Sequence, residues 1–397
     1  MKIQHVRVRH VFGTLQTEGL FWEERLVRPV DIYPDYRAVN WEEGGQQSDN
    51  AHLKIDQFFL EIITDSGIVG TAGPVNPDPA RLIVSSLVPR LIGRDPLAGE
   101  SLWDQMHRFQ VHGRQGATML AISAVDCALW DIRGQFYGAP VWRLLGGSGE
   151  LPVPAYASML GHNVEDKDLV RERAIAFKEK GYTAQKWFFR HGPMSGYEGL
   201  RKNVELVRTV REAVGEDYDL MFDCWQSFNL DYAVDLCSRI EEYRPRWIEE
   251  CFMPDRIDTY AKLKAKTLIP LAGAEHEYTR WGFKRFLEKD ALDILQPDIY
   301  WCGGLSEAIK IAAYATVHDL IVVPHGHSSN AGIHFSVSQS PIHTPYQEDL
   351  VKWNQITMHF LKTPVLPQDG VYHAPSEPGL GMALEADRIE YEEDLAA

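Results

Sequence analysis

The sequence lacks several features that would define whole classes of protein. Its 397 residues contain no uncharged apolar run approaching the ~20 residues of a membrane-spanning helix. No Lys- or Arg-rich run is present that could follow a phosphate backbone, and the formal net charge is −16. We therefore expect neither a membrane nor a nucleic acid as a partner.

Cysteine is scarce and shows no pattern. An odd number of widely spaced cysteines without a C-x-x-C pair indicates neither a disulfide framework nor a zinc knuckle. The five are Cys127, Cys224, Cys237, Cys251 and Cys302. At the N-terminus, charged residues interrupt every short apolar stretch, so no targeting segment is indicated. These features favour a soluble, unprocessed protein of the reducing cytoplasm.

Residues 1–150 are predicted to form a small α+β domain. Alternation of apolar and polar residues over 2–11 and 57–64 predicts antiparallel strands. The intervening segment 16–56 is rich in charged residues, Gly, Pro and aromatic residues, and is long for an ordinary connection, which is typical of a functional or disordered loop. Residues 80–145 show helical spacing instead.

From residue 151 onward, short apolar strands alternate with amphipathic helices, as in successive βα units. Seven or eight such units favour a closed barrel over an open sheet, and no G-x-G-x-x-G motif follows the first strand to suggest dinucleotide binding. The strands are expected at 153–158, 183–188, 218–223, 246–250, 269–275, 292–298 and 320–325, with a weakly marked eighth at 336–348. The barrel is expected to span 151–366, and the tail 367–397 to return to the N-terminal domain.

Five consecutive predicted strands end in an ionisable residue, at spacings of 26, 26, 23 and 27 residues. They are Asp223, Glu249, Glu275, Asp298 and His325. Each interval is about one βα unit, so the five side chains should meet at the C-terminal rim, where barrel enzymes carry out catalysis. Any one of the carboxylates alone is more simply a salt bridge or a helix cap, and His325 alone is equally well a core or capping histidine, but five in phase favour a site.

Three converging carboxylates need a compensating cation, and their oxygen ligands suit octahedral Mg²⁺. Asp298 and His325 lie on successive strands and form a natural acid–base pair, because a carboxylate fixes the imidazole tautomer and raises its basicity. The sequence thus predicts a metal-dependent enzyme that transfers protons.

Four motifs carry a resemblance to a known family: Ala-Val-Asp-Cys-Ala-Leu-Trp-Asp at 124–131, the Asp223, Glu249 and Glu275 trio, Gln-Pro-Asp at 296–298 with Gly303-Gly304, and Val-Pro-His-Gly at 323–326. Nearly the whole chain resembles the mandelate racemase branch of the enolase superfamily. Segments 220–225, 247–251, 275–277 and 301–305 most resemble its L-rhamnonate dehydratases.

The resemblance implies an α/β fold, a (β/α)7β TIM-type barrel with an N-terminal capping domain that the C-terminal tail completes. It also implies Mg²⁺ bound by the trio, and catalysis by His325 with Asp298. His276 and Glu348 match positions that line the substrate site; a solvated charge beside Asp349 is the alternative interpretation of Glu348. A homo-oligomer built from dimers, such as an octamer, is expected.

Two departures from the family pattern affect the expected chemistry. The family often carries a Lys-x-Lys motif on the second strand, but the sequence here is Lys186-Trp187-Phe188. The missing second lysine leaves one base, which disfavours racemisation by two bases. Lys186 itself is either a substrate contact or a rim lysine that reaches solvent. In the N-terminal loop, Phe21 stands where rhamnonate dehydratases carry a histidine. We expect this loop to set substrate choice. Its candidate substrate contacts are Arg25, Arg28 and Lys54.

The expected reaction is dehydration of an acid sugar, L-rhamnonate or a related aldonate, to a 2-keto-3-deoxy acid. Mg²⁺ would bind the substrate carboxylate and stabilise the enediolate formed when His325 removes the α-proton. His325 would then protonate the departing β-hydroxyl. The alternatives are a racemase, epimerase, cycloisomerase or other lyase on the same scaffold, and a non-catalytic sugar-acid binding protein.

Overall fold

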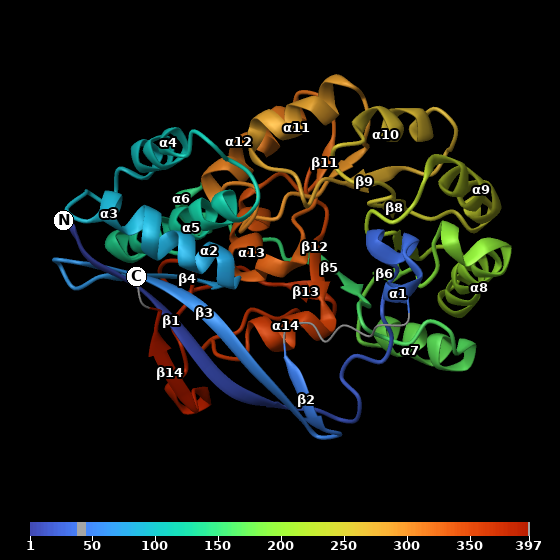
Figure 1. Cartoon of the computed structure of the whole chain (residues 1–397), viewed down its shortest axis with the longest axis horizontal. Helices are drawn as coiled ribbons and strands as arrows, with labels where there is room; N and C mark the ends of the chain where they lie inside the picture. Colours follow the sequence, from blue (N-terminus) through green and yellow to red (C-terminus); the bar gives the residue numbers. More distant parts are fainter. Residues whose placement is uncertain (38–44, 396–397) are drawn as a thin grey trace.

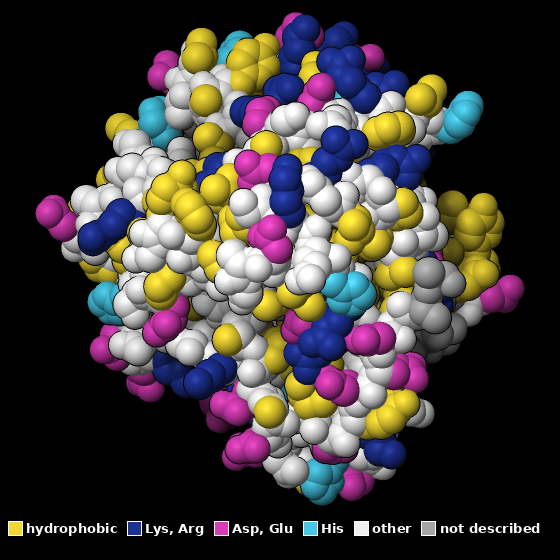
Figure 2. All heavy atoms as spheres, turned by 90° about the vertical axis from the view of Figure 1, so that its left-hand side faces the viewer, with side chains coloured by type: hydrophobic (Ala, Val, Ile, Leu, Met, Phe, Trp, Pro, Cys, Tyr) yellow, Lys and Arg dark blue, Asp and Glu magenta, His cyan; other side chains and the backbone are white. Residues whose placement is uncertain are grey.

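The computed structural model describes residues 1–37 and 45–395, which form an antiparallel sheet with helices and a curled parallel sheet surrounded by helices (Figure 1). Over the described residues, no helix combines the length and the apolar character that crossing a membrane requires. All five cysteines are buried and free. On the face in Figure 2, acidic and basic side chains are interspersed.

The N-terminal sheet has the order β14-β1-β3-β2, and β4 also pairs with β3. Its strands are β1 (Ile3–Gln16), β2 (Gln46–Asp49), β3 (His52–Thr64), β4 (Val69–Val75) and β14 (Tyr391–Asp394). All of these pairs are antiparallel. Strands β1 and β3 are longer than predicted, so part of the expected loop 16–56 is a hairpin. The other expectation is confirmed: the tail returns to this sheet through β14.

Helices and turns complete this part of the chain. The helices are α1 (Pro34–Arg37), α2 (Pro77–Leu82), α3 (Val88–Leu91), α4 (Gly99–Phe109), α5 (Ala117–Tyr137) and α6 (Val141–Leu144). Helical turns occur at Pro29–Ile32 and Ile83–Leu87. Helix α5 is apolar on most of its circumference, with buried residues such as Ile122, Val125 and Leu129, because it lies between β4 and the barrel helices.

The second sheet has the order β11-β10-β9-β8-β7-β6-β5-β12, and all of these pairs are parallel. Its strands are β5 (Val153–Ser158), β6 (Ala184–Phe188), β7 (Asp219–Asp223), β8 (Trp247–Glu249), β9 (Leu271–Gly273), β10 (Ile294–Leu295), β11 (Ile321–Val322) and β12 (Gln347–Leu350). The last strand pairs with the first, so the sheet curls into a barrel, as predicted. Strand β13 (Val371–Tyr372) adds an antiparallel partner to β5.

A helix follows each barrel strand. They are α7 (Lys167–Glu179), α8 (Gly196–Val214), α9 (Leu230–Ile240), α10 (Ile257–Lys264), α11 (Thr279–Glu288), α12 (Leu305–Thr316), α13 (Ser329–Ser338) and α14 (Val351–Thr357). Helical turns lie at Pro193–Ser195, Glu241–Tyr243, Gly326–Ser328 and Ala386–Arg388. The expected eighth strand at 336–348 was placed too early, because residues up to Ser338 belong to α13 and the strand begins at Gln347.

Candidate active site

The site is a polar layer on top of an apolar plug inside the barrel. One buried apolar residue from each of β5 to β10, together with Val323 directly after β11, fills the barrel: Tyr156, Ala184, Met221, Trp247, Ala272, Ile294 and Val323. Side chains alternate along a strand, so the residue two positions later points into the same interior. Those residues are Ser158, Lys186, Asp223, Glu249, Ala274, Gln296 and His325. All of them except Ala274 are polar, so the barrel interior changes from an apolar layer to a polar one between these two sets of residues.

Lys186 occupies the centre of this polar layer. Its side chain is 1% exposed, and its ammonium lies 3.1 Å from Asp223 Oδ2 and 2.8 Å from Glu348 Oε1 and contacts Glu249 Oε1. The alternative of a rim lysine that reaches solvent is therefore wrong. Glu348 is likewise fully buried on β12, where its Oε2 accepts from the backbone N–H of Gly326 at 2.7 Å, so it is not a solvated charge.

Asp298 and His325 are paired as predicted. His325 Nδ1 lies 2.8 Å from Asp298 Oδ2, and the other oxygen of Asp298 accepts from the backbone N–H of Tyr300 at 2.8 Å. His325 Nε2 lies 3.5 Å from Glu275 Oε2. Burial opposes protonation of His325, but the neighbouring carboxylates, Glu275 first, outweigh it and raise the pKa of His325 to about 10.

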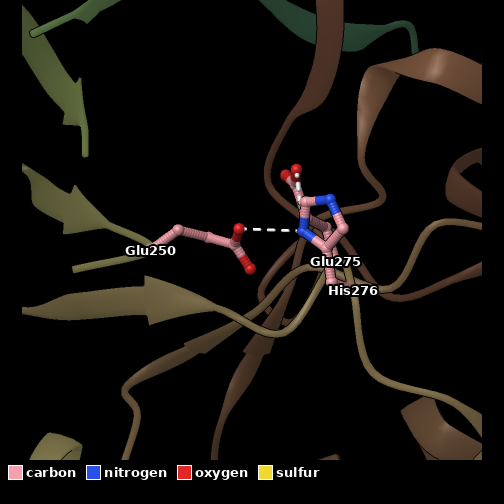
Figure 3. Close-up of side chains that lie close together, drawn as sticks. All are labelled: Glu250, Glu275 and His276. Atoms are coloured by element: carbon pink, nitrogen blue, oxygen red, sulfur yellow. Dashed lines mark hydrogen bonds and ion pairs between the residues drawn. The ribbon is translucent and has the colours of Figure 1, made fainter. Parts of the chain in front are cut away.

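Glu275 also belongs to a second group, with Glu250 and His276 (Figure 3). Their ligand atoms all lie within 4.8 Å of one another; His276 Nδ1 is 2.9 Å from Glu250 Oε2 and 3.4 Å from Glu275 Oε1. This group shares only Glu275 with the predicted metal trio. Glu249 instead accepts from Trp247 Nε1 and Gln296 Nε2, at 2.9 and 2.6 Å, and pairs with Lys186.

The donor set has an excess of negative charge that fits a divalent cation. Six buried carboxylates converge with three basic groups, Lys186, His276 and His325. The carboxylates are Asp223, Glu249, Glu250, Glu275, Asp298 and Glu348. Burial, with repulsion among these carboxylates, raises the pKa of Asp223 to about 6, of Glu275 to about 7 and of Glu249 to about 8. Lys186 supplies part of the charge that was expected from a metal alone, but does not balance the site.

A cavity of about 300 Å³ opens above these groups. Asp223, Glu275, His276 and His325 form its polar side, and aromatic side chains form much of the rest. The aromatic residues are Phe188, Trp225, Trp301 and Trp353. This size is at the lower end of the range for small-molecule sites. Phe188, which replaces the second lysine of the expected Lys-x-Lys pattern, lines the cavity with an apolar ring.

The N-terminal loop reaches the cavity through Leu26, which is one of the lining residues. Trp22 packs on Trp353, with ring centroids 6.0 Å apart. Glu23 anchors this segment, because it accepts from Lys352 Nζ at 2.9 Å and from Arg173. Phe21 is buried in the core and does not line the cavity, so this position, where the resemblance led us to expect a substrate contact, contributes packing in this structure.

The three cationic candidates of the loop differ in placement. Arg25 is buried, and its guanidinium donates to the carbonyls of Tyr36 and Arg37, both at 2.8 Å, and to Asp31, so it stabilises the loop itself. Lys54 is exposed on β3, away from the cavity lining. Both expectations of a substrate contact therefore lack support from the geometry. Arg28 lies over the ring of Trp225, 5.6 Å from its centroid; Trp225 lines the cavity, but Arg28 does not.

Sequence reasoning missed several residues of the site. His327 lines the cavity next to Trp301, and burial lowers the pKa of His327 to about 4, so it is neutral at physiological pH. Its position two residues after His325 was a usable signal. Glu250 and Gln226 were missed as well, and only their positions near the predicted strand ends pointed to them.

Comparisons with known proteins identify the family of this chain. Residues 48–146 match the family described as mandelate racemase / muconate lactonizing enzyme, N-terminal domain, and residues 168–388 match the family described as enolase C-terminal domain-like. An L-rhamnonate dehydratase of Saccharopolyspora erythraea is 34% identical over 400 residues, which cover 97% of each chain.

Solved structures agree with this assignment. A rhamnonate dehydratase from Gibberella zeae complexed with Mg is 30% identical with a TM-score of 0.81, and covers 98% of this chain and 95% of that one. The 3,6-anhydro-D-galactonate cycloisomerase from Zobellia galactanivorans is 27% identical with a TM-score of 0.78, over 98% and 99% of the two chains. The chain belongs to the mandelate racemase/muconate lactonizing enzyme family of the enolase superfamily.

Proposed function

We propose that the protein is an acid-sugar dehydratase that converts L-rhamnonate or a related aldonate to a 2-keto-3-deoxy acid. The observation that carries the proposal is the His325–Asp298 dyad, which faces a cavity whose other polar wall is rich in carboxylates. The similarity to rhamnonate dehydratases over nearly the full chain supports the same substrate class.

His325 is assigned the proton transfers. Asp298 holds the Nδ1 side of the imidazole, so Nε2 is the atom that accepts the α-proton of the substrate and returns a proton to the departing β-hydroxyl. The charge of Glu275 is the largest influence that raises the pKa of His325. Neutralising that carboxylate therefore shifts the histidine toward the neutral form that a general base needs at physiological pH.

Asp223, Glu249 and Glu275 are the proposed ligands of one Mg²⁺. A bound Mg²⁺ would draw electron density from the substrate carboxylate and make the α-proton more acidic. Glu250 and His276 are the alternative partners of Glu275 in this structure. Lys186 holds Asp223, Glu249 and Glu348 in place by its three ion pairs.

The loop that carries Trp22 and Leu26 is proposed to cover the cavity and to contribute to substrate choice. The ion pairs of Glu23 with Lys352 and Arg173 hold this loop against the barrel helices. Phe188 leaves His325 as the assigned base, which supports elimination from one face of the substrate over two-base racemisation.

The test is a library of aldonates incubated with the protein and Mg²⁺, assayed for 2-keto-3-deoxy acids with a carbonyl reagent. We expect turnover of L-rhamnonate, L-lyxonate or L-mannonate, and loss of turnover in Glu249→Gln that excess Mg²⁺ restores only in part. An isomer of the substrate without a new carbonyl would identify an epimerase or cycloisomerase instead. Recovery of all sugars unchanged would contradict an enzymatic role.

A further inference from the structure

Non-glycine residues with left-handed backbone cluster directly after the strands that carry the site. Gln226 has φ of 64°, Glu250 of 46° and Ala274 of 76°. Such conformations are strained for residues that carry a Cβ, and they persist where the surroundings hold them in place, often at functional sites. All three lie beside His276, which follows Ala274 by two residues. The local backbone is thus arranged around the side chain of His276.

Glu250 and Gln226 hold one edge of the His276 ring. Glu250 is 1% exposed, and its Oε2 lies 2.9 Å from His276 Nδ1 and accepts from Gln226 Nε2 at 3.0 Å. Gln226 Nε2 also lies 2.6 Å from His276 Nδ1. The backbone N–H of Gln226 donates to the carbonyl of Glu250, which fixes the two residues to each other.

The faces of the ring are enclosed too. The ring centroid of His276 lies 5.2 Å from that of Trp301 and 6.2 Å from that of Trp225. These polar contacts all involve Nδ1, so Nε2 at the opposite edge of the ring, visible in Figure 3, is the nitrogen left for the cavity that His276 lines. Trp301 also packs against His325 at 5.1 Å, so its ring contacts both histidines.

We propose that Glu250 and Gln226 are positioning residues that orient His276 so that its Nε2 meets a hydroxyl of the sugar acid in the cavity that both histidines line. The cavity then contains two histidines, each paired with a carboxylate. His325, paired with Asp298, transfers protons, and His276, paired with Glu250, orients the substrate. This assignment rests on the proposed function, because it names how the same site recognises its substrate.

The experiment is a double-mutant cycle of Glu250→Gln and His276→Asn, with kcat and KM measured for the best aldonate of the library. The expected result is a KM raised about 10–100-fold in each single variant, the range typical of lost positioning contacts. The double variant should be no worse than His276→Asn within about twofold, because Glu250 acts only through His276. Exchange of the substrate α-proton in D₂O at saturation should persist in Glu250→Gln. Effects that multiply in the double variant would overturn the proposal.

Gln226→Asn and Glu277→Gln complete the design. Asparagine tolerates the left-handed backbone but withdraws the amide from His276, so Gln226→Asn should raise KM without a large loss of stability. Glu277 is a nearby buried carboxylate that accepts from the backbone N–H of Tyr278 at 2.8 Å, and Glu277→Gln should leave KM within about twofold. If Glu250→Gln weakens Mg²⁺ binding in a calorimetric titration and leaves KM unchanged, Glu250 is a metal ligand and the proposal fails.

Two further measurements keep the proposal falsifiable. If Glu250→Gln does not fold, Glu250→Asp keeps the charge but shortens the reach to His276, and the same rise in KM is expected. The ¹⁵N signals of the His276 imidazole, assigned by its loss in His276→Asn, should change in Glu250→Gln without any substrate. An unchanged signal refutes the contact, whereas absent turnover by the wild type refutes the proposed function alone.

Discussion

Replacing Lys186 by methionine tests the electrostatic design of the barrel interior. The ammonium is 1% exposed and forms ion pairs with Asp223, Glu249 and Glu348. Methionine keeps most of the side-chain volume, so the cavity contribution to the loss is small. Removing one partner of a buried ion pair costs about 3–5 kcal/mol, because the remaining charge is left uncompensated. We expect a loss of this size in the free energy of unfolding at pH 8.

The loss should depend on pH in a defined direction. Burial already raises the pKa of Asp223 to about 6 and of Glu249 to about 8, against the lowering effect of Lys186. Without Lys186 these pKa values rise further. A carboxyl group whose folded pKa is raised contributes stability at low pH, and loses it as the pH rises from the unfolded pKa through the folded one. The destabilisation should therefore be smaller at pH 5 than at pH 8, by about 1.4 kcal/mol per pH unit for each titrating group.

Urea unfolding, followed by tryptophan fluorescence at several pH values, measures both quantities. Lys284→Met is the matched control, because Lys284 lies 3.2 Å from Glu288 in an exposed pair, and its loss should change stability by no more than about 0.5 kcal/mol. If Lys186→Met is as stable as the control at pH 8, or if its loss is larger at pH 5, the charge argument for this site is refuted.

Three further predictions concern the general base, the loop that carries Trp22 and Leu26, and stability at low pH. His325→Asn should abolish both dehydration and α-proton exchange in D₂O, and exchange that persists would reveal another base. Gly161→Ala should raise KM, because the new Cβ would lie 2.2 Å from the Trp22 ring; Gly196→Ala, also at positive φ but with no atom within 4 Å, should leave KM unchanged. His334 is fully buried, and burial lowers its pKa from 6.5 to about 3. Its neutral form therefore contributes stability above pH 6.5, and this stability is lost by about 1.4 kcal/mol per pH unit as the pH falls toward 3. In His334→Gln, the midpoint of urea unfolding should therefore change less between pH 7 and pH 5 than it does in the wild type.

The barrel was predictable because its strands are short, buried and separated by amphipathic helices of regular length. The eighth strand was misplaced for a specific reason. Its predicted range, 336–348, begins inside α13, where Ala331, Ile333 and Phe335 are buried like the residues around them. His334, between Ile333 and Phe335, and Ser336, directly after them, are buried too, so residues 330–336 of this helix show no apolar stripe with helical spacing. Periodicity carries no information when every face is buried.

The site was predictable where it follows strand alternation and less so where the backbone departs from it. Asp223, Glu249 and His325 each lie two residues beyond an apolar plug residue, so their direction follows from the pleat. Glu250 takes a left-handed conformation without being glycine, and nothing in the sequence marks this turn toward His276. Arg25 was a candidate substrate contact from the sequence, but in the fold its guanidinium donates to backbone carbonyls of the same loop. Such choices depend on distances between segments that only the folded chain sets.

The pairing of β14 with β1 has a consequence for biosynthesis. Residues 391–394 pair with residues 9–12, so β1 acquires this neighbour only after the barrel segments that lie between them in the sequence have left the ribosome. Until then, that edge of β1 presents unpaired backbone groups, which is the kind of edge that recruits strands from other chains. The barrel, by contrast, has its first and last strands, β5 and β12, within residues 153–350 and can close earlier. Pulse proteolysis of stalled nascent chains should therefore find the barrel protected before the N-terminal sheet.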